Sequence, residues 1–139
     1  MEKEKIKRYV FRAEVSKIFS ENSYLKPGRT RKGSSYLYLS PQARRYKEKL
    51  IEQFTEQMKK NGFPYGKAFP FMIVYEFHII EDRDVTNMIK VTEDAFSEAI
   101  GVDDSVWRKI MASKHFIGRD VHGVPESKEV VIIKAYCHV

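Results

Sequence analysis

The chain has a single cysteine, Cys137, and this scarcity excludes several classes of protein. One cysteine cannot form an internal disulfide, so the sequence does not describe a small disulfide-stabilised secreted domain. A zinc site built from a cysteine cluster is excluded as well. The four histidines are too scattered to suggest a binding motif, and His78, near Glu76, is typical of an ordinary core or surface histidine. We therefore expect a reducing compartment, the cytoplasm.

Long apolar runs are also missing. The longest, around residues 72–75, is typical of a buried strand and too short to span a bilayer, so we expect no membrane partner. Residues 2–5 are all charged and the N-terminus carries no apolar signal region, so we expect no export signal there. Internal repeats, low-complexity tracts and linkers are absent from the sequence, and 139 residues predict a single domain over residues 1–139.

What the chain does have is aromatic side chains and positive charge. Nine Phe and eight Tyr, with 42% hydrophobic residues, suffice for one real core. Lys and Arg number 25 against 19 Asp and Glu, which gives a net charge of +6. This balance favours a polyanionic partner such as nucleic acid, although a basic surface can also serve solubility alone.

The hydrophobic pattern predicts an α+β domain, a mixed β-sheet of about four to five strands with two helices packed on it. A helix is expected from Ser40, as N-cap, to Asn61, before Gly62, and a second over residues 86–100, before Gly101. The glycine- and proline-containing segment 21–35 and the polar segment 118–128 are predicted to be loops. Strands are predicted over residues 9–19, 36–39, 69–80, 106–116 and 129–136.

Polar groups of a particular kind surround the second predicted helix. Asp84, Asn87 and Lys90 open it with a carboxylate, an amide and an ammonium group, and Asp103-Asp104 follow its end. Carboxylates are the ligands that a hard divalent cation prefers, and an ammonium group attracts phosphate. Acids arriving from both ends of one helix, in a basic chain, therefore indicate a metal-dependent nuclease.

The order and spacing of these residues resemble a known family. Asp84-Val85-Thr86-Asn87-Met88-Ile89-Lys90 is similar to the pattern Asp-x-Asp-Asn-x-x-Lys of the RusA family of Holliday junction resolvases. Asp94-Ala95-Phe96 and Asp103-Asp104 resemble the Asp-Ala-Leu and Asp-Asp segments that follow in the family. The similarity extends over roughly residues 14–136, although only the central part is specific. The resemblance implies a homodimeric, RusA-like endonuclease that cuts branched DNA, namely four-way junctions, using Mg²⁺ or Mn²⁺.

The resemblance also implies roles for individual residues. Asp84 and Asp104 are the best candidates for metal ligands, and Asp103 and Asp82 are further candidates. Lys90 is expected to lie over the phosphate, where it would neutralise charge in the transition state or protonate the leaving group. Asn87 is expected to orient a ligand or water. Several acids that lie close together repel one another, so at least one of them should have a raised pKa when no metal is bound.

One position departs from the family pattern. The second aspartate of the family is Thr86 in this chain, and threonine offers a neutral oxygen instead of a charge. Asp82 would supply the missing carboxylate if the preceding strand persists to it, since residues two apart on a strand share a face. Alternatively, Thr86 is only the helix N-cap and the site works with the other aspartates. A third possibility is a protein that binds junctions and cuts them poorly.

Basic residues are expected to bind the DNA phosphates in a manner that salt weakens. They lie in the predicted loop and at the start of the first predicted helix: Lys26, Arg29, Arg31, Lys32, Arg44 and Arg45.

Each feature also has an ordinary interpretation. Asp84 or Thr86 would serve as a helix cap, Lys90 and Asp94 as an exposed ion pair, and Asp103-Asp104 as turn residues. On that interpretation the chain is a basic structural or assembly protein.

Overall fold

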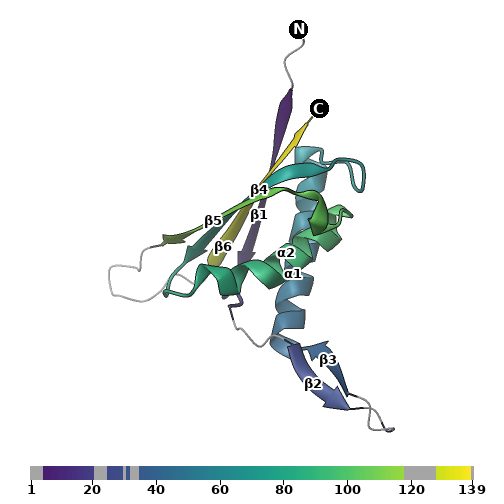
Figure 1. Ribbon diagram of the computed structural model, residues 1–139. Coiled ribbons are helices and arrows are strands. Elements are labelled where there is room, and N and C mark those ends of the chain that lie inside the picture. The colour runs from purple at the N-terminus through teal and green to yellow at the C-terminus, as the bar shows by residue number, and fades with distance from the viewer. Residues whose placement is uncertain (1–4, 21–24, 30, 32–34, 118–127, 139) are drawn as a thin grey trace.

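A computed structural model of the chain shows one main sheet (Figure 1). Its long strands carry alternating apolar residues. The structure describes residues 5–20, 25–29, 31, 35–117 and 128–138. The elements follow one another as β1 (Ile6–Val15), β2 (Leu25–Arg29), β3 (Ser35–Leu39), α1 (Pro41–Asn61), β4 (Pro70–Ile79), α2 (Val85–Ile100), the short 3₁₀ helix η1 (Asp104–Val106), β5 (Lys109–Phe116) and β6 (Glu129–His138).

The main sheet is mixed and has the strand order β1-β6-β4-β5. β6 pairs antiparallel with both β1 and β4, whereas β4 and β5 run parallel because α2 connects them. Both helices lie on the same side of the sheet, α1 against β1 and α2 against β4 and β5 (Figure 1). The predicted α+β class, with two helices on a mixed sheet of four strands, is confirmed.

The core lies between this face of the sheet and the two helices. The side chains of β4 alternate between buried residues that face the helices and half-buried residues on the opposite face. At the centre, the ring of Phe11 meets the edges of the Phe54 and Phe96 rings, with centroids 6.2 and 4.9 Å apart. Such edge-to-face contacts suit the quadrupoles of the rings and add to the burial of their apolar area.

Capping residues set the ends of both helices as the sequence predicts. Ser40 accepts a hydrogen bond from the backbone N–H of Ala43 at 3.2 Å, and Pro41 occupies the first turn of α1. Gly62 ends α1 and Gly101 ends α2, both with positive φ. At Gly101 φ is 70°, a left-handed conformation that favours glycine, and a Cβ atom would come within 2.6 Å of the exposed Tyr65 ring, which would have to shift.

The prediction of a loop over residues 21–35 is wrong in part, because it contains β2 and the first residue of β3. These two strands form a separate antiparallel ribbon, with Pro27 opposite Leu37, which projects from the main body at the start of α1 (Figure 1). A two-stranded ribbon leaves one edge of each strand unpaired, and an edge tolerates a proline that has no N–H to donate. Tyr36 to Leu39 lie in β3, as predicted.

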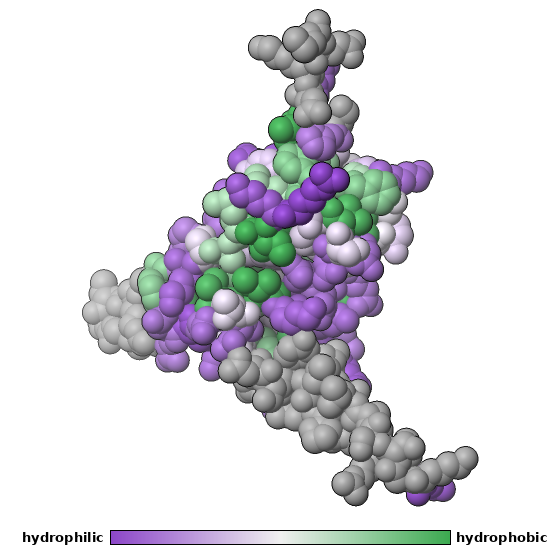
Figure 2. All heavy atoms as spheres, viewed as in Figure 1, coloured by the Kyte–Doolittle hydropathy of each residue, from purple (hydrophilic) through white to green (hydrophobic). Residues whose placement is uncertain are grey.

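The surface combines charged groups with apolar ones. In the part of the chain that the structure describes, no helix is long and apolar enough to cross a bilayer. β5 forms one edge of the main sheet, and it exposes three large hydrophobic side chains, Ile110, Met111 and Phe116. In Figure 2 hydrophobic residues gather in the middle of the viewed face, with hydrophilic residues around them.

Candidate active site

The N-terminal end of α2 carries Asp84, which is the N-cap of the helix. One of its carboxylate oxygens, Oδ1, accepts hydrogen bonds from the backbone N–H of Thr86 at 3.0 Å and from the Thr86 hydroxyl at 2.8 Å. These hydrogen bonds hold the pKa of Asp84 below its usual value. The carboxyl group is exposed and ionised, so its other oxygen can still meet a cation. The suggestion that Thr86 itself caps the helix is wrong.

Asp82 does not share a strand face with Asp84, because β4 ends at Ile79. It is exposed, and its Oδ1 lies 2.5 Å from the ammonium nitrogen of Lys114 on β5. Asp82 would replace the family's second aspartate only if the strand continued to it. The strand ends before Asp82, so this condition is not met.

Arg83, between these two aspartates, points the other way and has a structural role. Its guanidinium group forms a bidentate ion pair with the buried carboxylate of Glu129 on β6. The same carboxylate accepts hydrogen bonds from the backbone N–H groups of Ile18 at 2.7 Å and Ile80 at 2.8 Å. Burial alone would raise the pKa of Glu129, but Arg83 and the two N–H groups hold it below its ordinary value. This ion pair fixes the turn that leads into α2.

The other end of α2 leads into Asp103 and Asp104. Asp103 is exposed, and it caps the 3₁₀ helix by accepting a hydrogen bond from the backbone N–H of Ser105 at 2.9 Å, which lowers its pKa. Asp104 is half-buried. Its carboxyl group interacts with that of Glu93, whose pKa it raises, and with that of Asp103.

Glu93 is the residue that joins Asp104 to the core. It lies in the middle of α2, and its Oε2 atom accepts hydrogen bonds from the hydroxyl of Tyr75 at 3.1 Å and the indole N–H of Trp107 at 3.4 Å. Burial raises the pKa of Glu93, and the neighbouring Asp104 carboxyl raises it further against the lowering effect of the two donors. Two adjacent carboxyl groups, one with a raised pKa, are typical of sites that bind cations or move protons.

Lys90 and Asp94 lie beside this carboxyl pair on α2. The Lys90 ammonium nitrogen lies 3.4 Å from Oδ1 of Asp94, a pair spaced by one helical turn. Lys90 is also three residues before Glu93, so both belong to the same stripe of the helix. Asn87 is half-buried one turn earlier. The ammonium group of Lys90 therefore lies on the same side of α2 as the carboxyl groups of Glu93 and Asp94.

The structure does not gather the predicted aspartates into one cluster. Glu93, which Asp104 approaches, is nine residues after Asp84, about 13 Å along the helix axis at 1.5 Å per residue. Two ligands of one Mg²⁺ ion are separated by no more than about 4 Å, because each binds at about 2.1 Å. Within the described residues, Asp82, Asp84, Asp103 and Asp104 supply no set of three carboxylates within ion-bridging reach of one another.

The basic residues predicted to bind DNA lie in two places. Arg44 and Arg45 are exposed on the first turns of α1, and Arg45 borders an open groove of about 610 Å³ with Lys17 and Lys49. Lys26 and Arg29 lie on β2, Arg31 is exposed in the turn after it, and Lys32 lies outside the described residues.

Comparison with known proteins decides the family. The model of the family described as endodeoxyribonuclease RusA matches residues 21–124, most of the chain. The chain belongs to the RusA family. No curated protein sequence matches it closely enough to identify a relative. Among solved structures, that of the bifunctional IspDF from Campylobacter jejuni is similar at a TM-score of 0.40 and 8% identity, over 96% of this chain and 43% of that one.

Glu93 was missed in the sequence because the RusA pattern draws attention to the aspartates on either side of it. A signal was nevertheless present in the helical period. Residues 88, 92, 95 and 99 form the buried stripe of α2, and Glu93 borders that stripe where an unpaired carboxylate would be costly. An acid at the margin of a buried stripe needs hydrogen-bond donors, which Tyr75 and Trp107 supply.

Proposed function

We propose that this member of the RusA family is a divalent-metal-dependent endonuclease that resolves four-way DNA junctions. The observation that carries the proposal is the Glu93 carboxylate, which hydrogen bonds from Tyr75 and Trp107 orient beside the Asp104 carboxyl group; burial, and then this second acid, raise its pKa. The carboxylate oxygens of this pair fit Mg²⁺, because Mg²⁺ prefers oxygen ligands. One or two carboxylates are enough when water and phosphate complete the coordination. Mn²⁺ would accept the same ligands.

Asp104 and Glu93 would hold the metal, with Asp103 as the neighbour most easily recruited. When bound, the ion supplies charge relief on the phosphate and a more acidic water. The hydrogen bonds from Tyr75 and Trp107 fix the Glu93 carboxylate in one orientation, as donors around a metal ligand commonly do.

The chain's own cation acts on the substrate. Lys90, whose ammonium group reaches Asp94, is placed on the same stripe of α2, so it can attract a phosphate to the carboxyl pair and neutralise charge as it develops. Asn87, one turn before Lys90, can donate a hydrogen bond to the same phosphate. The exposed Arg44 and Arg45 are proposed to hold a neighbouring duplex arm through its backbone.

Asp84 and Asp82 remain candidate metal ligands. They lie at the N-terminal end of α2, near Lys114. Their part in metal binding is a separate question from that of Asp104. An Asp84→Asn variant of an enzyme that uses Asp84 would bind a junction without cutting it. Cutting at the wild-type rate by that variant would remove Asp84 from the mechanism.

The test of the main proposal is nicking of a synthetic four-way junction in Mg²⁺ or Mn²⁺. We expect symmetrical nicks with either metal and none in the presence of a chelator. Linear duplex of the same sequence is the control, and it should be cut much more slowly. No metal-dependent nicking of any branched substrate would contradict the proposal.

A second candidate function is junction binding without efficient cleavage. It is supported by the hydroxyl of Thr86, which donates to Asp84 at 2.8 Å in the position where the family pattern has an aspartate. Tight junction binding with no cleavage in either metal, and cleavage restored by Thr86→Asp, would favour this function. A third interpretation, a structural protein, would be favoured by the absence of salt-sensitive DNA binding.

We further propose a homodimer, since two copies are needed to cut two strands of a symmetric junction. The β5 edge supports it, because an edge strand with exposed apolar side chains is suited to pairing with another chain. Mass measurement by light scattering should give a dimer. A Met111→Lys variant, with a charge on this edge, should give a monomer, whereas the same change at exposed Tyr65 should not.

A further inference from the structure

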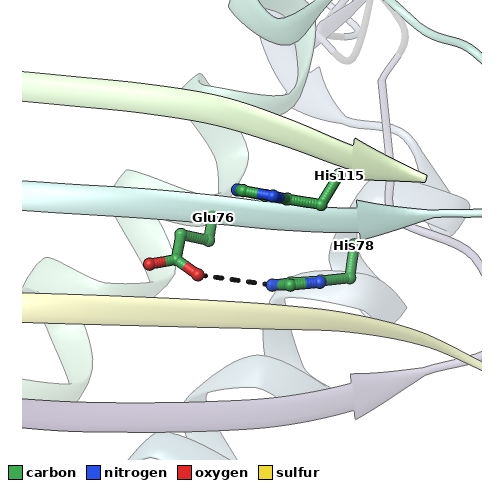
Figure 3. A group of neighbouring side chains, drawn as sticks. All are labelled: Glu76, His78 and His115. Carbon is green, nitrogen blue, oxygen red and sulfur yellow. Dashed lines mark hydrogen bonds and ion pairs between the residues drawn. The ribbon is translucent and has the colours of Figure 1, made fainter. Parts of the chain in front are cut away.

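Three side chains with metal-binding groups meet on the face of the sheet that the helices do not cover. They are Glu76 and His78 on β4 and His115 on β5, and one ligand atom from each lies within 4.8 Å of the others (Figure 3). Oε1 of Glu76 is 3.4 Å from Nε2 of His78, and the rings of the two histidines are stacked with centroids 4.7 Å apart. All three side chains project from the sheet on the same side.

The strand register, and not the sequence spacing, brings these residues together. Glu76 and His78 are two apart on β4, so they share a face of the sheet. The parallel pairing of β4 with β5 places His115 directly beside His78. Because both strands belong to one hydrogen-bonded sheet, the three Cα positions are fixed before any ion arrives, which lowers the cost of forming a site.

The surroundings of the cluster orient the carboxylate and leave one oxygen for a ligand. Lys134 on β6 donates to Oε2 of Glu76 at 2.7 Å, while Oε1 turns toward His78. The hydrogen bond to Lys134 holds the pKa of Glu76 low, so the carboxylate is ionised. On β5, the hydroxyl of Ser113 lies 2.9 Å from Nε2 of His115. The Lys134 charge opposes a nearby cation, so we expect micromolar and not tighter affinity.

We propose that Glu76, His78 and His115 form a binding site for a divalent transition-metal ion of the zinc class. Two imidazole nitrogens and one carboxylate oxygen suit Zn²⁺ and its neighbours, whereas Mg²⁺ prefers oxygen ligands alone. Three protein ligands would leave one position of a tetrahedral ion for water. To reach one ion, the two imidazole rings must turn out of their stack, and His115 must exchange the Ser113 hydroxyl for the metal.

This site is distinct from the Glu93–Asp104 pair and does not depend on the proposed nuclease function. Tyr75, which binds Glu93, is buried beneath the helices, whereas Glu76 lies on the opposite face of the same strand. The sheet itself separates the two sites.

The experiment is a titration of the full chain, without a histidine tag, with Zn²⁺ followed by calorimetry and with Co²⁺ followed by its visible absorption. We expect one equivalent to bind with micromolar affinity, and Co²⁺ to show the strong visible bands of tetrahedral nitrogen and oxygen coordination. His78→Ala and His115→Ala should each weaken binding by more than about 100-fold, beyond the range caused by loss of an outer-shell partner.

The matched control is His138→Ala, which removes a histidine from the far end of β6, where it stacks on Phe71. It should leave the affinity of the Glu76–His78–His115 site for Zn²⁺ unchanged. His115 is exposed, so its replacement leaves the core intact and circular dichroism can verify the fold. Failure of the wild-type chain to bind Zn²⁺, or equal affinity in His115→Ala, would overturn the proposal.

Discussion

The two ends of α2 both carry aspartates, but their surroundings differ. At the N-terminal end, Asp84 is exposed and engaged in capping, and Asp82 pairs with Lys114. Toward the C-terminal end, Asp104 is half-buried against Glu93, whose pKa is raised. The difference shows that an acid's place in a motif does not reveal its electrostatic state. Capping lowers a carboxyl pKa and stabilises a helix, whereas burial, reinforced by a second acid nearby, raises the pKa and leaves a demand for positive charge that a metal can meet.

The largest effect is expected from Asp104→Asn. Loss of a ligand should remove several kcal/mol of charge stabilisation, and at 1.36 kcal/mol per factor of ten this corresponds to about a 1000-fold slower single-turnover cleavage of a four-way junction. Asp94→Asn, which alters only the exposed partner of Lys90, is the matched control and should retain most activity. Equal rates for the two variants would show that Asp104 contributes no more to cleavage than the exposed Asp94 does.

The N-terminal end should be sensitive in stability instead. Glu129→Gln leaves the Arg83 guanidinium group without its buried partner, and loss of one member of such a pair costs about 3–5 kcal/mol in the free energy of unfolding. Urea unfolding of Glu129→Gln and of the exposed control Glu81→Gln measures the difference. A change as small as that of the control would show that the pair does not anchor the start of α2.

The same carboxylate predicts a pH dependence of stability. The pKa of Glu129 is lower in the folded protein than in the unfolded chain, so the folded state favours the ionised form. Its contribution is present above the unfolded pKa, about 4.3, and is lost as the pH falls through the lower folded value. Urea titrations at successive pH values should show this loss in the wild type and a weaker one in Glu129→Gln.

The pH dependence of cleavage should come from a raised pKa, that of Glu93, and not from a lowered one. Because the pKa of Glu93 is raised, its carboxyl group takes up a proton at a higher pH than an ordinary glutamate does. A metal requires the ionised form, so Mg²⁺ affinity and cleavage should both decline as the pH falls through this raised value. The Mg²⁺ concentration for half-maximal cleavage, measured across pH, should rise there. An affinity that is constant down to the ordinary glutamate range would contradict this assignment.

The smallest effect is expected at the basic residues of α1. Arg44→Ala and Arg45→Ala should each weaken junction binding modestly, and each should reduce the slope of log K against log salt by about 0.9 if one phosphate contact is lost. The equivalent change at exposed Lys60, at the far end of α1, is the control. A slope unchanged in all variants would remove α1 from the DNA interface.

Most of the fold was readable from the sequence because periodicity and caps act locally. Ser40 and Pro41, Gly62 and Gly101 set helix ends that the structure reproduces. β2 was not foreseen, and neither was its pairing with the predicted strand at residues 36–39, since proline and glycine within a strand normally indicate a loop. Proline and glycine are acceptable in β2 because one edge of this strand is unpaired. The sequence alone does not show which strand edges are unpaired, since that depends on how the strands pair.

The candidate site was readable only in part. The motif indicated the family and drew attention to Asp104 and Lys90, but it could not show that Glu93 lies next to Asp104, because their contact depends on how η1 packs on α2. The cluster of Glu76, His78 and His115 was hidden for a related reason. Its members are brought together by strand register, and scattered histidines in a sequence carry no signal of that register.

The central claim is that the carboxyl pair of Glu93, in the middle of α2, and Asp104, in η1, performs the metal-dependent chemistry. The most direct test is the single-turnover cleavage rate of Glu93→Gln on a four-way junction at saturating Mg²⁺, with junction affinity measured in parallel without metal. The account predicts a rate reduced by about 100-fold or more, in the range seen when a group that stabilises transition-state charge is removed, with affinity unchanged. A rate equal to that of the wild type would contradict it.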